Sequence, residues 1–208
     1  MSASGSCTAC SVVIFGDTYG LPRLLSHVGS ERAAALVRAG IRPEQAPPLT
    51  KLAREHDLPL LVQPPAESGD FPAFIGALKE LSPDVLLVDS YSMLLPPAVL
   101  ALAPRGGANV HGALLPEFRG VNPIQWALLE DARETGVTVH ALTEAFDAGP
   151  VYGQRRVPIH FADTWLDIQG RIGVATEELL SDVVPGILAG TAKAVPQDES
   201  RARYHRRR

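Results

Sequence analysis

The stretch Asp84-Val85-Leu86-Leu87-Val88-Asp89 decides the fold of this chain. Its four central residues are apolar, which is typical of a strand that is covered on both faces in a parallel sheet. Further strands are expected at residues 11–16, 33–37, 59–62, 107–111, 137–142 and 151–158. Helices are expected at residues 21–28, 51–56, 70–81, 97–102, 123–131 and 164–187, with Thr50 and Asp163 as N-caps of two of them. This alternation predicts an α/β fold with a mostly parallel twisted sheet and helices on both faces.

The composition predicts one compact unit with a single substantial core. The chain has 208 residues, of which 46% are hydrophobic. We expect one domain over residues 1–190, followed by an Arg-rich tail over residues 191–208. No apolar run approaches the roughly 20 residues that span a bilayer, and residues 1–7 lack the basic start of a secretory signal. A cytoplasmic location without a membrane partner is therefore expected.

The charge distribution argues against a nucleic-acid partner. The net charge is −4, and residues 201–208 contain five arginines and no acid. The rest of the chain carries 14 basic and 23 acidic residues, so it offers no broad positive surface to a phosphate backbone. Terminal runs of charge are commonly solvated, and we expect the same of residues 201–208.

The cysteines and histidines do not form a ligand set for a metal. Cys7 and Cys10 make a single Cys-x-x-Cys, whereas a structural zinc site needs four protein ligands. His56, His140 and His160 are not spaced as partners of these cysteines or of a carboxylate pair. No metal is therefore expected.

Two polar residues, Asn109 and His111, end an apolar strand and are spaced to face the same way. Ligands bind at the carboxyl ends of strands in open α/β sheets. Asp147 follows the next expected strand, on the turn Phe146-Asp147-Ala148-Gly149. Taken singly, these residues also suit a loop contact, a core histidine and a turn. Taken together, they predict a site where an amide, an imidazole and a carboxylate converge.

Longer motifs around these residues resemble the folate-dependent formyltransferase family. The resemblance rests on Asn109-x-His111-x-x-Leu114-Leu115-Pro116-x-x-Arg119-Gly120, on Gly136-Val137-Thr138 and on Asp147-x-Gly149. These motifs follow one another in the family's order, from about Val85 to about Trp165. The resemblance implies a Rossmann-like fold and transfer of a formyl group from 10-formyltetrahydrofolate to an amine, through a tetrahedral intermediate and without a metal.

The resemblance also implies a role for each of the three residues. Asn109 and His111 are expected to donate N–H groups to the oxyanion of the intermediate, where one such donor is typically worth roughly 3 kcal/mol. Asp147 is expected to orient His111, to favour its imidazolium form, and to accept the proton that the amine releases.

Binding residues follow from the same resemblance. The pterin is expected at a strand end and at the loop before Asp147, with Leu87, Asp89, Tyr91, Leu142, Thr143 and Phe146 as candidates. Arg119, Gly120 and Asn122 are candidates for contact with the substrate, and Arg119 suits the pinning of its own loop equally well. Ala113 stands where the family usually has serine, so one hydroxyl is missing from this loop. His140 is expected to pack against the wall of the site.

The turn after the first expected strand distinguishes between several classes of enzyme. Its sequence is Gly16-Asp17-Thr18-Tyr19-Gly20-Leu21-Pro22. It lacks the Gly-x-Gly-x-x-Gly of a nicotinamide dehydrogenase. Its Asp17 and bulky Tyr19 do not resemble the phosphate loop of the purine-synthesis formyltransferases. Initiator-tRNA formyltransferases carry a further C-terminal domain and formyl-folate hydrolases a further N-terminal one, and we expect neither here.

The motif Arg119-Gly120-x-Asn122-Pro123-Ile124-x-Trp126 resembles enzymes that formylate small amines. We therefore expect the acceptor to be an amino sugar, an amino acid or a precursor of a specialised metabolite. Purine-type and methionyl-tRNA-type transfer, formyl-folate hydrolysis, and a non-enzymatic folate-binding or partner-docking module stay open as alternatives. The apolar residues 174–184 suit a homodimer contact as readily as the domain's own core.

Overall fold

A computed structural model describes residues 10–40 and 46–206 of the chain. Cys7, residues 41–45, and residues 207–208 of the tail lie outside this part. The main sheet has seven strands in the order β3-β2-β1-β4-β5-β7-β8. Their bounds are β1 Val12–Gly16, β2 Ala33–Ala39, β3 Leu60–Gln63, β4 Val85–Asp89, β5 Gly107–His111, β7 Glu134–Ala141 and β8 Val151–Pro158. The first five in chain order are parallel, β7 runs antiparallel to β5, and β8 runs antiparallel to β7 and so in the direction of the first five, which confirms the mostly parallel sheet.

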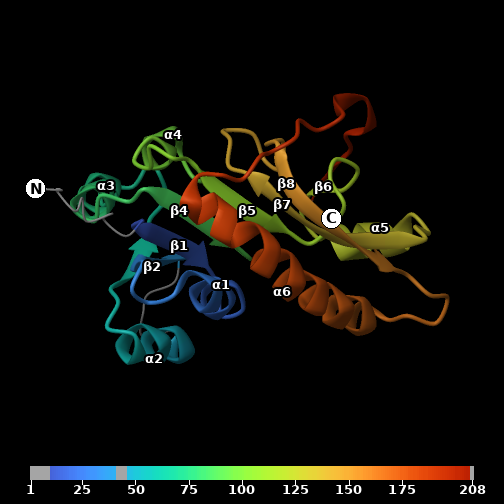
Figure 1. Cartoon of the computed structure of the whole chain (residues 1–208), viewed down its shortest axis with the longest axis horizontal. Helices are drawn as coiled ribbons and strands as arrows, with labels where there is room; N and C mark the ends of the chain where they lie inside the picture. The colour runs from blue at the N-terminus through green and yellow to red at the C-terminus, as the bar shows by residue number, and fades with distance from the viewer. Residues whose placement is uncertain (1–9, 41–45, 207–208) are drawn as a thin grey trace, which may run out of the picture.

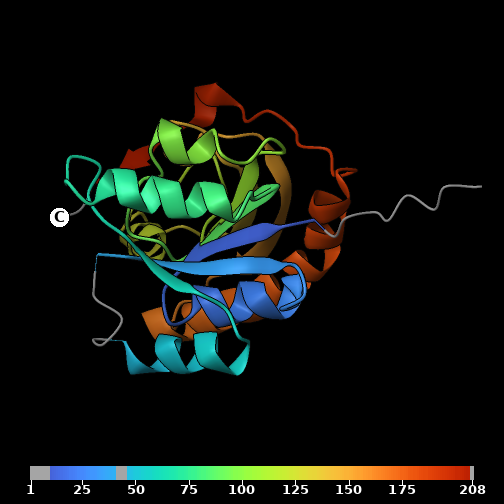
Figure 2. The same ribbon diagram turned by 90° about the vertical axis from the view of Figure 1, so that its left-hand side faces the viewer.

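Helices cover both faces of this sheet (Figure 2). One face carries α1 (Gly20–Val28), α2 (Pro47–Glu55) and the long α6 (Trp165–Ala189), and the other carries α3 (Phe71–Glu80) and α4 (Pro97–Leu100). The short α5 (Pro123–Leu129) packs against α6 and β7. The expected helices and strands are thus present, with shifts at their ends.

Two apolar clusters fill the layers between helices and sheet. Val12 and Ile14 of β1 belong to the cluster under α1, α2 and α6, whereas Val13 and Phe15 belong to the cluster under α3 and α4. Successive side chains of a strand point to opposite faces, so a central strand of this sheet contributes to both clusters. This is the physical reason why β1 and β4 are apolar along nearly their whole length.

The N-cap expected at Thr50 is wrong. The helix α2 begins at Pro47 with Ala46 as its N-cap, so Thr50 lies inside the helix. Proline suits the first helical position because its ring fixes a helical φ and it has no N–H group that would need a capping partner.

The N-cap expected at Asp163 is also wrong, by one residue. Thr164 is the N-cap of α6, because its side chain accepts the N–H of Asp167 while the Asp167 carboxylate accepts the N–H of Thr164. This reciprocal pair is a capping box. Asp163 instead forms an ion pair with Arg171.

The C-terminal segment is folded back onto the body of the protein (Figure 1). After α6, Val195 bridges Val151, a short 3₁₀ helix covers Glu199–Arg201, and β9 (Tyr204–His205) pairs with β6 (Arg119–Gly120). The backbone of residues 201–205 is therefore attached to the body of the protein, whereas the side chains of Arg201 and Arg203 stay mostly exposed to solvent.

The apolar stretch of α6 mainly serves the core. Leu179, Leu180 and Val184 are buried against the sheet, whereas Val174 is exposed. Within residues 10–40 and 46–206, no helix combines the length and the apolar character needed to cross a membrane.

Candidate active site

Asn109 and His140 lie opposite each other on β5 and β7. Their neighbours Ala108 and Val139 point into the core under α6, so Asn109 and His140 lie on the other face of the sheet. The Nε2 atom of His140 is 3.1 Å from Nδ2 of Asn109, and its Nδ1 atom is 2.9 Å from the carbonyl oxygen of Ala141. A carbonyl only accepts, so Nδ1 carries the proton of the neutral ring and Nε2 accepts an N–H from Asn109.

His111 is buried between two oxygen atoms. Its Nε2 atom donates to the carbonyl oxygen of Phe118 at 2.7 Å, and its Nδ1 atom is 3.5 Å from Oδ1 of Asp147. Burial lowers the pKa of His111 below its ordinary value and outweighs Asp147 and Phe118, which favour the charged ring. Burial therefore opposes the imidazolium form that the sequence predicts, whereas Asp147 and the Phe118 carbonyl favour it.

Asp147 lies between the two imidazole rings, on the loop from β7 to β8. Its Oδ1 atom is 3.5 Å from Nδ1 of His111 and 3.5 Å from Nε2 of His140, and its Oδ2 atom accepts the N–H of Gly120 at 2.7 Å. Burial alone would raise the pKa of Asp147, but the contact with His140, the His111 ring and the Gly120 N–H together lower it below its usual value. The carboxylate therefore stays ionised at physiological pH.

These four side chains provide groups for both charges of a formyl transfer. Asn109 has two amide protons, so it keeps one N–H beyond the one that His140 accepts. The fixed charge of Asp147 favours a positive charge on an attacking amine, and an imidazole ring is a common general acid–base group. In contrast to the role expected from the sequence, both ring nitrogens of His111 face oxygen atoms of the protein itself.

The candidate folate residues at the end of β4 are buried or bound. Leu87 is part of the core under α1, so its side chain does not face the site. Asp89 accepts from Nη1 of Arg23 at 2.9 Å. The hydroxyl of Tyr91 donates to Oε1 of Gln63 at 2.9 Å.

The candidate folate residues in the loop before Asp147 are more accessible. Phe146 is 54% exposed, and Thr143 donates its hydroxyl proton to the carbonyl of Ala145. Leu142 is partly buried and packs at the margin of the α3–α4 cluster. An exposed aromatic residue and several backbone groups therefore lie next to Asp147 in the chain.

Arg119 is only 1% exposed and pins its loop to the C-terminal segment. Its guanidinium donates to Oε1 of Gln197 at 2.8 and 3.1 Å, to both carboxylate oxygens of Glu199 at 2.6 and 2.9 Å, and to the hydroxyl of Tyr204 at 3.0 Å. Of the two roles considered for Arg119, the structure supports the pinning of the loop.

Gly120 and Asn122 continue this loop. The N–H of Gly120 is bound by Asp147, as described above. Asn122 is the N-cap of α5 and has a left-handed backbone, with φ of 56°. Both residues therefore stand close in the chain to the carboxylate, with Asn122 at the start of a helix.

The first turn contains its own anion. Oδ1 of Asp17 accepts the N–H groups of Tyr19 and Gly20 at 2.8 and 3.0 Å. A Cβ on Gly20 would lie 2.1 Å from the carbonyl oxygen of Asp89, so this glycine is needed for the packing of α1 on β4. The amides that open α1 are therefore already satisfied by a carboxylate of the chain.

Two residues of this region escaped the sequence analysis. The sequence predicts His140 at the wall of the site, yet its ring contacts both Asn109 and Asp147. The alternation of His140 with Val139 along one strand is the signal that the sequence offers. Gln197 binds the loop of Asp147 from 50 residues away in the chain, and no local pattern announces such a contact.

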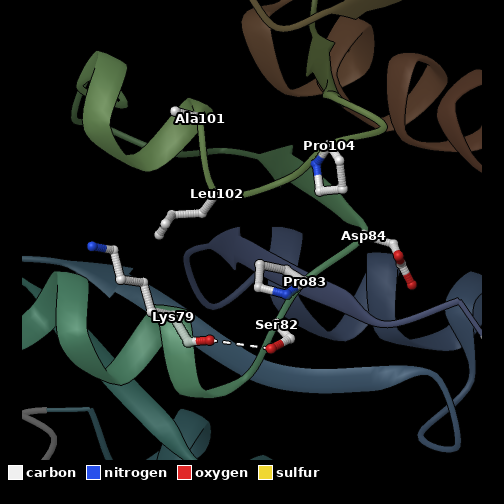
Figure 3. Close-up of a pocket in the computed structure, with 7 residues that line it drawn as sticks. All are labelled: Lys79, Ser82, Pro83, Asp84, Ala101, Leu102 and Pro104. Carbon is white, nitrogen blue, oxygen red and sulfur yellow. Dashed lines mark hydrogen bonds between the residues drawn. The ribbon is translucent and has the colours of Figure 1, made fainter.

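A separate hollow lies at the opposite end of the strands (Figure 3). Its lining comes from the segments that precede β4 and β5, namely Lys79, Ser82, Pro83, Asp84, Ala101, Leu102 and Pro104. Within the part of the chain that the structure describes, no group of three or more His, Cys, Asp or Glu side chains is placed to hold a metal ion.

Comparison with known proteins places this geometry in context. A family model described as formyl transferase matches residues 30–184. The fold is similar to glycinamide ribonucleotide transformylase 1 from Symbiobacterium toebii, with TM-score 0.77, 23% identity, and coverage of 95% of this chain and 99% of that one. The same enzyme from Geobacillus kaustophilus gives TM-score 0.73, 27% identity and coverage of 86% and 99%. WlaRD, a sugar 3N-formyl transferase solved in the presence of dTDP and 5-N-formyl-THF, gives TM-score 0.71, 17% identity and coverage of 95% and 69%.

Proposed function

Because the chain belongs to the formyl transferase family, we propose that it transfers a formyl group from 10-formyltetrahydrofolate to the primary amine of a small molecule. The observation that carries this proposal is the convergence of Asn109, His111, His140 and Asp147 on one face of β5 and β7. The exposed ring of Phe146 and the backbone of its loop, beside Asp147, suit a flat heterocyclic donor.

The donor supplies the formyl carbon, and the residues of the chain manage the charges. As the amine nitrogen bonds to that carbon, the remaining N–H of Asn109 stabilises the negative oxygen. Asp147 stabilises the positive nitrogen and takes its proton, directly or through His140. The proton then reaches the folate nitrogen as its bond to carbon breaks, so the protein ends in its starting state.

The first turn supports a small acceptor without a phosphate at that position. In the family's purine branch, backbone N–H groups of this turn bind a substrate phosphate, whereas here the Asp17 carboxylate accepts them. An added phosphate would also meet the negative charge of Asp17. Amino sugars, amino acids and precursors of specialised metabolites fit this arrangement.

Glycinamide ribonucleotide is the second candidate acceptor. The observation in its favour is the similarity in fold to the two glycinamide ribonucleotide transformylases, over nearly their whole length. Hydrolysis of the formyl-folate, without any acceptor, is a third outcome that the same experiment detects.

The test is incubation of the protein with 10-formyltetrahydrofolate and a pooled library of amines, followed by mass spectrometry. The library contains amino sugars, nucleotide-linked amino sugars, amino acids and glycinamide ribonucleotide. A product heavier by one formyl group, absent with His111→Ala, is expected and names the acceptor. Formylation of glycinamide ribonucleotide alone would replace the small-amine proposal with the purine-type reaction.

Two results would contradict the transferase. Release of tetrahydrofolate without a formylated amine would identify a hydrolase. Binding of the folate without release or product would identify a folate-binding module.

A further inference from the structure

The backbone of Asp147 adopts a conformation that needs support from other parts of the chain. Its φ is 53°, in the left-handed region that side chains other than glycine rarely adopt. Such a conformation persists when the surroundings impose it. The contacts that impose it come from two other parts of the chain, the loop at Arg119 and the C-terminal segment.

Gln197 provides the contact from the C-terminal segment. Its Nε2 atom donates to the carbonyl oxygens of Asp147 and Gly149, at 2.8 and 2.7 Å. Its Oε1 atom accepts from Nη2 and Nε of Arg119, at 2.8 and 3.1 Å. Carbonyls only accept and a guanidinium only donates, so the orientation of this amide is fixed and both of its ends are satisfied.

Arg119 closes a ring of contacts around the carboxylate. The next residue, Gly120, donates its N–H to Oδ2 of Asp147 at 2.7 Å. Asp147 is therefore held at its carboxylate by the Arg119 loop and at its carbonyl by Gln197, while Gln197 itself holds the Arg119 loop. The side chain of Gln197 thus contacts both the Asp147 loop and the Arg119 loop, and it sets the distance between them.

We propose that Gln197 is a positioning residue of the active site, which places the Asp147 carboxylate by holding the loops of Asp147 and Arg119 together. This rests on the proposed function in assigning Asp147 to the reaction. It makes residues 197–205 a working part of the catalytic domain, in place of the separate tail expected from the sequence.

The test compares Gln197→Glu with the control Glu199→Gln. The first variant keeps an oxygen toward Arg119 but turns a second oxygen toward the carbonyls of Asp147 and Gly149, so it pushes the loop away. The control alters the pairing of the same Arg119 and leaves the contacts with the Asp147 loop intact. Should Gln197→Glu fail to fold, Gln197→Asn, which withdraws the same amide by one methylene group, carries the test.

Two readouts separate positioning from a general structural role. In Gln197→Glu, kcat for formyl transfer is expected to fall by roughly tenfold to a hundredfold with little change in KM, because a shift of about 1 Å at a reacting group costs on that order. Hydrogen exchange of the Gly120 amide is expected to accelerate, because its acceptor is Asp147, whereas exchange at Val121, whose N–H donates to His205, stays unchanged.

The proposal is overturned if Gly120 exchanges at the wild-type rate in Gln197→Glu. It is equally overturned if Glu199→Gln lowers kcat as much as Gln197→Glu does, since the effect would then pass through Arg119 alone. If the wild-type protein transfers no formyl group, the proposed function fails, and the exchange at Gly120 still decides whether Gln197 holds Asp147.

Discussion

Gly149 stands so close to Ala141 that a Cβ atom on Gly149 would lie 1.9 Å from the carbonyl oxygen of Ala141. The loop that carries Asp147 is therefore pressed directly against the end of β7. Gly149→Ala is expected to lower the free energy of unfolding by about 1–3 kcal/mol, the usual cost of forcing extra atoms into a packed site. Urea denaturation measures this change.

Gly173→Ala is the matched control, because a Cβ at Gly173 of α6 meets nothing within 4 Å. There the same substitution is expected to raise the free energy of unfolding by about 0.8–1 kcal/mol, the difference between the helix propensities of glycine and alanine. Equal effects at the two positions would contradict the packing that the structure describes.

Asp147→Asn is expected to lower the rate of formyl transfer at least about a hundredfold, the range reported for the loss of a general base. The variant removes the negative charge between His111 and His140 but keeps an oxygen for the Gly120 N–H. The melting temperature should therefore change little. Initial rates and a thermal melt check both points, and near-normal turnover would remove Asp147 from the mechanism.

His140→Ala is expected to slow formyl transfer by roughly tenfold or more, because Asn109 loses the partner that orients its amide at the reacting carbon. His160→Ala is the control, since His160 is exposed and lies outside the site. Initial rates of the purified variants decide the point. A loss of equal size in both variants would show that removal of any histidine has this effect.

The stability of the protein should depend on pH through His111. Its folded pKa lies below its ordinary value of 6.5, so the unfolded chain takes up the proton first as pH falls. The free energy of unfolding should therefore fall as pH drops below about 6.5, with a slope of at most about 1.4 kcal/mol per pH unit from this one group. Below the folded pKa the loss is complete.

Urea denaturation of the wild type and of His111→Gln isolates this contribution, over a range from about one pH unit above to about one and a half units below the ordinary histidine pKa of 6.5. The slope should be smaller in the variant. Asp147 does not contribute to the slope in this range. Its pKa is lowered in the folded protein, so the stability that depends on its charge is lost only below about pH 3.8. Identical slopes would contradict the burial of a neutral His111.

Two truncations test which part of the C-terminal segment stabilises the protein. Removal of residues 204–208 deletes β9 and takes the Tyr204 hydroxyl away from the buried Arg119. Arg119 keeps its hydrogen bonds to Gln197 and Glu199. Each hydrogen bond lost typically contributes about 0.5–1.5 kcal/mol, so the free energy of unfolding should fall by at least that amount. Removal of residues 206–208 keeps β9 and should have little effect. Urea denaturation of both truncations provides the measurement.

The sequence was sufficient to predict the layers of the fold. Apolar runs such as residues 84–89 identify strands covered on both faces, and the turn residues between them separate the helices, although both predicted N-caps were wrong. The antiparallel direction of β7 could not be read from these patterns, because apolar strands look alike in either direction. It is this direction that brings His140 opposite Asn109.

Only those features of the site that depend on neighbouring residues in the chain could be predicted from the sequence. The spacing of Asn109 and His111 along one strand fixes their common face, and this spacing is visible in the chain. The pKa of His111 depends on how much of the fold covers it, and the partner of Arg119 lies 78 residues further along the chain. Burial and long-range pairing are properties of the assembled molecule, and no local window contains them.

The return of residues 197–205 to β6 has a consequence for the order of assembly. During synthesis, all strands of the main sheet are made before this segment. Domains commonly begin to fold from the N-terminal side as the chain emerges. A nascent chain with its sheet already formed would thus hold Asn109 and His111 on one strand and still lack the contacts that place Asp147, so activity would arise only when the last turn of the chain has docked.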